Sequence, residues 1–189
     1  NDASSAIYAT HEILSQDENS NYKDSLAILY YRTNNFISAH LVAKEILLTK
    51  PYDATLLEIN AVSLKSLNAT KEAIEAYEKL VKVSKSRLHY YELALLQLSI
   101  TRYGEALQNA KFALENTEKI DFKLSISKDT QQQLVPLDAA LHNLKGIILF
   151  ELKDDKMAGL SFDEALKLMP DFQLALQNKA SLADKLKTK

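Results

Sequence analysis

Histidine and carboxylate side chains occur in this chain, but their spacing matches no catalytic or metal-binding motif. The four histidines are His11, His40, His89 and His142. No two of them are three or four residues apart, the spacing that would place two imidazoles on one face of a helix. The acidic pairs Asp17-Glu18 and Asp154-Asp155 are interpreted as polar residues where helices break. We therefore expect no metal site.

The sequence also lacks a recognisable nucleophile or phosphate-binding loop. It contains no Cys and no Gly-x-Ser-x-Gly pattern, so neither an activated thiol nor a nucleophilic serine is indicated. Its three Gly residues are separated from one another and cannot build a glycine-rich loop around a phosphate. We therefore predict that the protein is not an enzyme, has no catalytic residues and needs no cofactor.

Composition and charge argue against several other functions. The 189 residues carry a net charge of −2 at pH 7, so no general basic excess attracts nucleic acid. The basic run from Lys79 to Arg87 is offset by neighbouring glutamates and is interpreted as a solvated helix face. No apolar segment approaches the roughly 20 residues of a membrane-spanning helix. We expect a soluble protein with no nucleic-acid partner and no membrane span. The sequence does not identify the compartment: we expect it to be cytoplasmic or, if a signal peptide has been removed, bacterial periplasmic.

The most informative pattern in the sequence is a repeat of small residues. Four times, a small residue is followed twelve positions later by alanine: Ala27/Ala39, Ala61/Ala73, Ala94/Ala106 and Gly146/Ala158. The alanines that close the first three pairs recur at a nearly constant interval, and the fourth follows after one more such interval and an insertion. An interval of about 34 residues is typical of arrays of helical hairpins. Small side chains at both positions let two antiparallel helices approach closely.

The rest of the sequence favours an all-α fold. Apolar residues recur at three- and four-residue spacing within each unit, and the three Gly and three Pro are too few for the turns of a β-rich protein. Two local predictions concern helix starts. Thr70 is expected to cap the N-terminus of one helix, and Pro136 is expected to begin another.

The units resemble the tetratricopeptide repeat (TPR), a helix–turn–helix of about 34 residues. The last unit carries the small residues, the aromatic residue and the closing proline of that family at Gly146, Ala158, Phe162, Ala165 and Pro170. The other units match in part, and the resemblance covers roughly residues 20–172. It implies an all-α, right-handed α-solenoid of stacked antiparallel helix pairs.

We predict a single TPR-like domain over residues 1–189, made of consecutive segments. These are a degenerate leading helix at 4–19, repeats at 20–53, 54–86, 87–120 and 139–171, an inter-repeat insertion at 121–138 and a C-terminal capping helix at 172–187. The insertion contains an alternating stretch from Lys123 to Ser127. It is interpreted as a length variant, in which the preceding helix runs on and the remainder loops, or as a flexible excursion.

The TPR resemblance also implies a binding groove, because in that family the first helix of each pair lines a concave surface. The corresponding positions here are Asp24, Ile28, Tyr31, Arg32, Glu58, Val62, Lys65, Ser66, Tyr91, Leu95, Leu98, Ser99, Asn143, Ile147, Phe150 and Glu151. The residues predicted to bind a partner are Tyr31, Arg32, Lys65, Tyr91, Leu95, Asn143, Ile147 and Phe150. About half of the groove positions are expected to be exposed, with Tyr31, Arg32, Lys65, Tyr91, Asn143 and Phe150 foremost.

These features together predict a non-catalytic protein–protein interaction module. It would act as a scaffold or adaptor that binds a peptide or a protein segment in its groove. The sequence does not identify the partner. Two alternatives stay open: a self-assembling structural protein that forms homo-oligomers, and an accessory or regulatory subunit of an enzyme or envelope complex.

Overall fold

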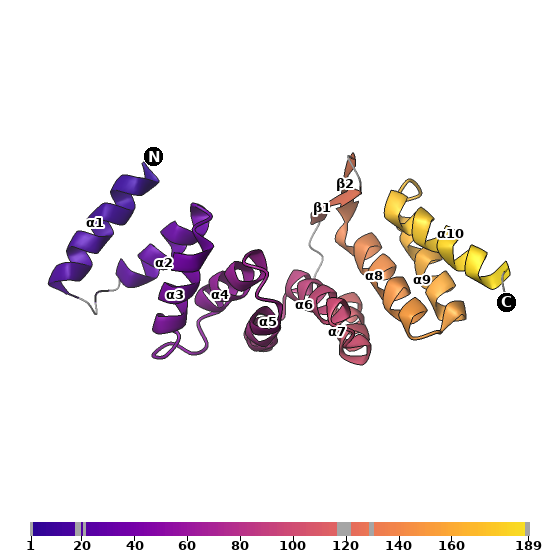
Figure 1. Ribbon diagram of the computed structural model, residues 1–189, viewed down its shortest axis with the longest axis horizontal. Coiled ribbons are helices and arrows are strands. Elements are labelled where there is room, and N and C mark those ends of the chain that lie inside the picture. The colour runs from indigo at the N-terminus through magenta and orange to yellow at the C-terminus, as the bar shows by residue number, and fades with distance from the viewer. Residues whose placement is uncertain (1, 18–19, 21, 117–121, 129–130, 188–189) are drawn as a thin grey trace. The chain divides into compact units, whose positions relative to one another are not determined.

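The computed structural model describes residues 2–17, 20, 22–116, 122–128 and 131–187. The predicted polar break at residues 17–21 and the predicted insertion at 121–138 fall partly on residues outside these ranges. The chain divides into two compact units, Asn1–Lys85 and Ser86–Lys189, which are treated separately below. Both are built almost entirely from helices that pack in adjacent pairs (Figure 1). This confirms the predicted all-α fold.

The first unit consists of a leading helix and two helix pairs. Its helices are α1 (Ala3–Gln16), α2 (Tyr22–Arg32), α3 (Phe36–Ile46), α4 (Ala54–Ser66) and α5 (Thr70–Ser84). Helix α2 packs against α3, and α4 packs against α5. Helix α4 also contacts α3 and α2, so successive pairs stack on each other. Helix α1 packs against α2.

The second unit contains two helix pairs, a β-hairpin and a final helix. Its helices are α6 (Arg87–Ser99), α7 (Tyr103–Glu115), α8 (Leu137–Glu151), α9 (Asp155–Leu168) and α10 (Gln173–Lys187). Strands β1 (Lys123–Lys128) and β2 (Gln131–Pro136) lie between α7 and α8 in the chain. Helix α6 pairs with α7 and α8 with α9, while α10 packs against α9 and α8.

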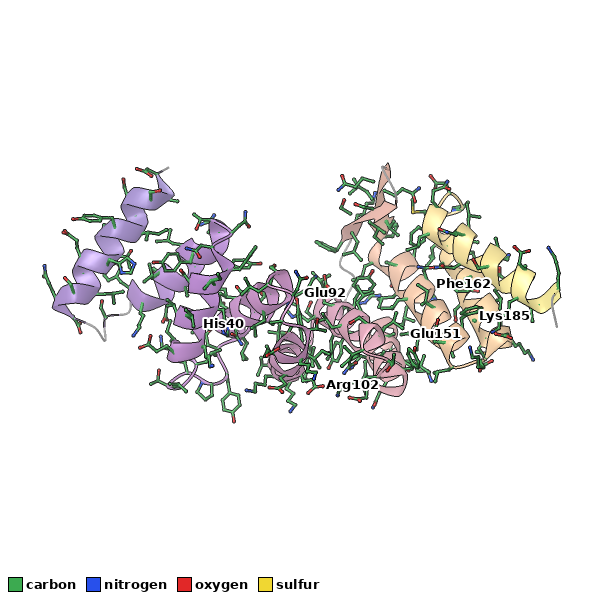
Figure 2. The ribbon with its side chains drawn as sticks, viewed as in Figure 1. His40, Glu92, Arg102, Glu151, Phe162 and Lys185 are labelled. Atoms are coloured by element: carbon green, nitrogen blue, oxygen red, sulfur yellow. The ribbon has the colours of Figure 1, made fainter. Side chains whose placement is uncertain are left out.

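The close approach predicted from the small residues is present in every pair. Ala27, Ala61 and Ala94 in the first helices are completely buried, and so is each alanine that follows twelve residues later in the second helices. The approach is close at Gly146 of α8, where an added Cβ would lie 2.4 Å from Cε1 of Phe162 in α9. That distance is far inside van der Waals contact, so the glycine makes room for the buried ring of Phe162 (Figure 2).

The four turns within the pairs share one backbone conformation. Asn34, Asn68, Thr101 and Lys153 have φ values of 58°, 57°, 63° and 64°. Each lies five residues before the alanine of its second helix. In every turn the N–H of the next residue donates to the carbonyl oxygen five residues earlier, at 2.9–3.0 Å. This left-handed residue with a long-range backbone bond is the Schellman ending of an α-helix, and it turns the chain back within a few residues.

The insertion between the third and fourth pairs is a β-hairpin docked on the core, not a loop or an excursion. In the described residues β1 pairs with β2 antiparallel, and Leu124 lies opposite Val135. Val135 is completely buried and belongs to the same apolar cluster as residues of α6, α8 and α10. The side-chain amide of Gln133 donates to the carbonyl of Asp171 at 2.8 Å and accepts from the N–H of Gln173 at 2.9 Å, which ties β2 to the start of α10.

Two predictions about helix starts are wrong by one residue. Thr70 is the first residue of α5, and Ala69 occupies the cap position without a side-chain hydrogen bond. Thr70 does not cap the helix because the chain turns at the left-handed Asn68, which places Ala69 at the cap position. Pro136 is the cap residue of α8 and the end of β2, and Leu137 begins the helix.

A buried charge holds three helices of the second unit together. Arg87 of α6 is buried; its Nε donates to the carbonyl oxygen of Ala113 in α7 at 2.8 Å, and its guanidinium forms an ion pair with Asp138 of α8. A buried guanidinium is tolerated only when its donors are paired, so this arrangement makes the relative placement of α6, α7 and α8 specific.

We predict that Gly146→Ala destabilises the protein by about 1–3 kcal/mol, because the new methyl group forces the Phe162 ring out of a packed position. The free energy of unfolding in urea measures this. Gly104→Ala is the matched control: a Cβ there meets nothing within 4 Å, so stability should stay level or rise. Equal losses for both variants would contradict the proposed contact.

We predict that Thr101→Asn stabilises the protein by about 1 kcal/mol, because a β-branched residue is strained at positive φ and Asn tolerates that region. Thr101 is exposed, so the substitution removes no packing. The reverse change in the equivalent turn, Asn68→Thr, should lower stability by a similar amount. Both are measured as shifts in thermal midpoint. A destabilised Thr101→Asn variant would show that the positive φ of Thr101 does not lower the stability of the wild type.

Candidate protein-binding surface

The first helices of each unit contact one another and present a matched row of aliphatic side chains. In the first unit α2 contacts α4, and in the second α6 contacts α8. One residue after the small residue of each first helix stands a branched aliphatic residue: Ile28 and Val62 in the first unit, Leu95 and Ile147 in the second. All four remain at least partly exposed. We call these residues the aliphatic row of their unit.

Helix geometry explains why the row is exposed. Adjacent residues on an α-helix point about 100° apart. The small residue faces the second helix of its own pair, as Gly146 faces Phe162. The next residue is therefore rotated away from that contact, and it stays at least partly exposed. The row is a consequence of the same register that produces the close helix approach.

In the first unit, charged residues flank the aliphatic row. Asp24 and Glu58 precede it on α2 and α4, and Arg32 and Lys65 follow it on the same helices. Asp24 accepts a hydrogen bond from Lys50 at 2.5 Å, which partly neutralises it. Arg32 is exposed and Lys65 is half-buried. The surface therefore changes from acidic to basic along the direction of these helices.

Tyr31 is half-buried in this surface and adds an aromatic face. Its ring packs edge-on against Phe36, with centroids 6.4 Å apart. Burial raises the pKa of the Tyr31 hydroxyl, and the negative charge of Glu58 on α4 raises it further. Glu58 therefore lies close enough to Tyr31 for its charge to act on the hydroxyl. The hydroxyl stays protonated at neutral pH and can donate a hydrogen bond.

In the second unit the aliphatic row continues into a half-buried aromatic ring. Phe150 of α8 is covered on one face by the ammonium group of Lys185 from α10, 4.2 Å from the ring centroid. The same ammonium forms an ion pair with Asp155 at 2.5 Å, and Lys185 lies close to the α8–α9 pair (Figure 2). Ile147 and Phe150 both pack against the apolar cluster of Leu149, Ala158, Phe162 and Leu182, and Leu95 packs against the cluster that contains Tyr91. All three are therefore available only in part.

The predicted exposure of Tyr91 and Asn143 is wrong. Tyr91 is 8% exposed and lies in the apolar cluster that includes Val135 of the hairpin. Its burial, with a smaller effect of Glu92, strongly raises its pKa. Asn143 is 3% exposed and accepts a hydrogen bond from Asn178 of α10 at 2.9 Å. The hairpin adds Val135 to the cluster around Tyr91, a neighbour that the repeat pattern does not contain. Asn143 is covered by α10, which packs on α8 as the next helix of the stack.

The eight predicted partner-binding residues therefore fall into three groups. Arg32 is exposed; Tyr31, Lys65, Leu95, Ile147 and Phe150 are half-buried; Tyr91 and Asn143 are buried. The list of eight predicted partner-binding residues omitted Ile28 and Val62, which belong to the aliphatic row. Both could have been selected from the sequence, because each directly follows the small residue of its first helix.

The described residues bring together no group of three or more His, Asp or Glu side chains that could hold a metal ion. Likewise, none of the helices in the described part of the chain has the length and apolar character needed to cross a bilayer.

Solved structures of TPR proteins resemble this chain over most of its length. MamA is 15% identical, with a TM-score of 0.71 over 86% of this chain and 85% of that one. A TPR protein from Parabacteroides merdae is 17% identical, with a TM-score of 0.72 over 98% of this chain and 68% of that one. YrrB, described as a TPR protein with an unusual peptide-binding site, is 15% identical, with a TM-score of 0.77 over 95% of this chain and 84% of that one.

No protein-family model and no curated protein matches the sequence. The structural likeness establishes the fold as that of TPR proteins.

We predict that Glu58→Gln lowers the pKa of Tyr31 but leaves it above the ordinary value of 10.0, since burial is the larger cause of the shift. Alkaline titration by ultraviolet absorbance measures this, with the Tyr31→Phe variant identifying the Tyr31 contribution. Glu92→Gln, whose carboxylate acts on Tyr91 instead, is the matched control. An unchanged Tyr31 titration in Glu58→Gln would show that the charge of Glu58 does not act on the Tyr31 hydroxyl.

Proposed function

We propose that this chain is a non-catalytic protein-binding module whose first helices take up an extended segment of another protein. The aliphatic row is the observation that carries the proposal. Its four members occupy the same position in four first helices, and each remains at least partly exposed. Side chains that only stabilise the fold have no need to stay accessible at this position in every repeat.

The chemistry of the surface favours a partner with aliphatic side chains and a polar backbone. The row offers apolar contact, and the hydroxyl of Tyr31 and the guanidinium of Arg32 offer donors to main-chain carbonyls or carboxylates. Buried tyrosine and arginine contacts contribute disproportionately to binding energy. In the first unit, acidic residues precede the row and basic residues follow it, so a bound segment meets opposite charges on the two sides of the row.

Each unit offers its own part of this surface. The first unit combines its row with Tyr31 and Arg32, which favours a segment with an acidic or main-chain acceptor group. The second combines its row with Phe150 and Leu98, and so favours a more apolar segment. The two parts can be tested independently because no step of the argument depends on how the units are placed.

We predict that replacing the aliphatic row by aspartate abolishes peptide binding. The wild type should select aliphatic-rich peptides from a displayed library of random linear peptides. The selected peptides should bind the Ile28→Asp/Val62→Asp or the Leu95→Asp/Ile147→Asp variant at least about tenfold more weakly, according to the unit that binds them. Affinities are measured by isothermal titration calorimetry.

The matched control places the same changes on a second helix. Ile37 and Leu41 of α3 are 61% and 58% exposed, so Ile37→Asp/Leu41→Asp introduces aspartates into an apolar surface that is more accessible than the aliphatic row. Circular dichroism establishes that all variants keep their helices. The proposal fails if the control loses binding as strongly as the row variants, or if both row variants bind the selected peptides like the wild type.

A further inference from the structure

The β-hairpin of the second unit has strand edges that no other strand covers. Strands β1 and β2 lie at the start of α8, and in the described part of the chain they form a two-stranded sheet with no third strand (Figure 1). Each strand therefore has a strand partner on one side only. The edge of a sheet presents a row of N–H and C=O groups that can pair with another chain.

The register of the hairpin identifies the backbone groups that point outwards. Lys123 lies opposite Pro136, so Phe122 and Leu137 form the next pair. The N–H of Leu137 donates to the carbonyl oxygen of Phe122 at 3.0 Å, so this is a hydrogen-bonded pair. Hydrogen-bonded and non-hydrogen-bonded pairs alternate along an antiparallel ladder. The residues of β1 whose N–H and C=O groups point to its outer edge are therefore Lys123, Ser125 and Ser127.

The outer edge of β1 is accessible and unpaired. Lys123, Ser125 and Ser127 are all exposed, and their backbone groups form no hydrogen bond with any described residue outside the hairpin. The outer edge of β2 offers less. Pro136 has no N–H, which removes one of its donors, and Gln133 ties this strand to the start of α10. A third strand therefore finds its complete set of donors and acceptors on β1.

The side chains on one face of β1 favour a strand with aliphatic residues at alternate positions. Successive side chains of a strand point to opposite faces of the sheet. Leu124 and Ile126 share one face; both are half-buried and pack against the apolar cluster that contains Val135. Phe122, two residues before Leu124, is 40% exposed. A strand beside β1 would place every second side chain against the parts of these residues that are still exposed.

The charge of β1 favours an acidic strand. Its sequence contains Lys123 and Lys128 and no acidic residue. Lys123 is exposed and forms no ion pair with any residue that the structure describes. Opposite charges on adjacent strands attract each other, whereas like charges repel. A second copy of β1 would bring two more lysines and no carboxylate, so the charges favour a different, acidic chain as the occupant of this edge.

We propose that the outer edge of β1 binds an extended, acidic segment of a partner protein as a third strand of the sheet. Main-chain hydrogen bonds to Lys123, Ser125 and Ser127 hold the segment in place. Aliphatic side chains at alternate positions contact the face of Leu124 and Ile126, and a carboxylate lies beside Lys123. Strand addition of this kind takes its affinity from the backbone and its specificity from the alternate side chains. The site goes beyond the aliphatic row and uses none of its residues.

The test uses the whole chain and a heptapeptide that alternates valine with threonine and glutamate. Amide hydrogen exchange is followed by NMR with and without the peptide. At about 90% occupancy the amides of Lys123, Ser125 and Ser127 should exchange about tenfold more slowly, because only the free chain leaves them open to solvent. The amides of Gln132 and Leu134, on the other edge, should be unchanged. Protection of the β2 edge instead, or no binding up to about 1 mM peptide, would overturn the proposal.

A matched pair of proline variants tests the backbone contact. Ser125→Pro removes an outward N–H from β1, and Leu134→Pro removes one from the residue directly opposite on β2. The first variant should bind the peptide at least about tenfold more weakly, and the second should bind it like the wild type. Equal losses in two variants that keep their fold by circular dichroism would contradict strand addition to β1.

Modified peptides test the same contact on the unmodified protein, so the result does not depend on the folding of a variant. N-methylation of one alternate set of peptide amides should abolish binding, and N-methylation of the other set should leave the affinity within about twofold, because only one set faces β1. No difference between the two sets would overturn the proposal.

A row variant distinguishes this site from the aliphatic row. Leu95→Asp/Ile147→Asp should bind the heptapeptide like the wild type. If it loses binding while Ser125→Pro keeps it, the peptide occupies the aliphatic row and the proposal for β1 fails. That outcome would leave the proposed function of the first helices intact.

Discussion

The closeness of two antiparallel helices is the constraint on which the rest of this structure depends. Each pair crosses at a small residue, and each pair turns through a residue with positive φ five positions before the next small residue. The turn fixes the register of the two helices, and the small side chains then permit contact at that register. A larger residue would separate the helices and expose their apolar faces, so stacking of successive pairs would lose its matching surfaces.

Stacking alone does not specify which pair lies next to which, and polar contacts supply part of that specificity in the second unit. Arg87 joins three helices through the Ala113 carbonyl and Asp138. The side chain of Gln133 fastens the hairpin to the start of α10. Such buried or semi-buried polar groups are costly when unpaired, so alternative arrangements that break these bonds are disfavoured. The irregular part of the repeat is thus held by directional bonds as well as by apolar burial.

The helix pairs could be predicted because one local pattern determines them. The spacing of Ala61 and Ala73 within a helical apolar pattern predicts a crossing point, and the structure buries both completely. The hairpin was harder to predict. Residues 123–127 alternate as a strand should, but the matching strand contains consecutive glutamines and no alternation that marks it. Its placement depends on contacts with the start of α10 and with α6, which are distant in sequence. The burial of Tyr91 depends on the same hairpin and could not be foreseen for the same reason.

The register of each helix pair also explains why the residue that permits close packing differs from the residue that is proposed to bind a partner. In each first helix the small residue faces inward and is constrained by its neighbour across the pair, whereas the next residue stays at least partly exposed. Leu95 and Ile147 also pack against apolar clusters of the second unit, so part of each side chain contributes to stability and part is left for recognition.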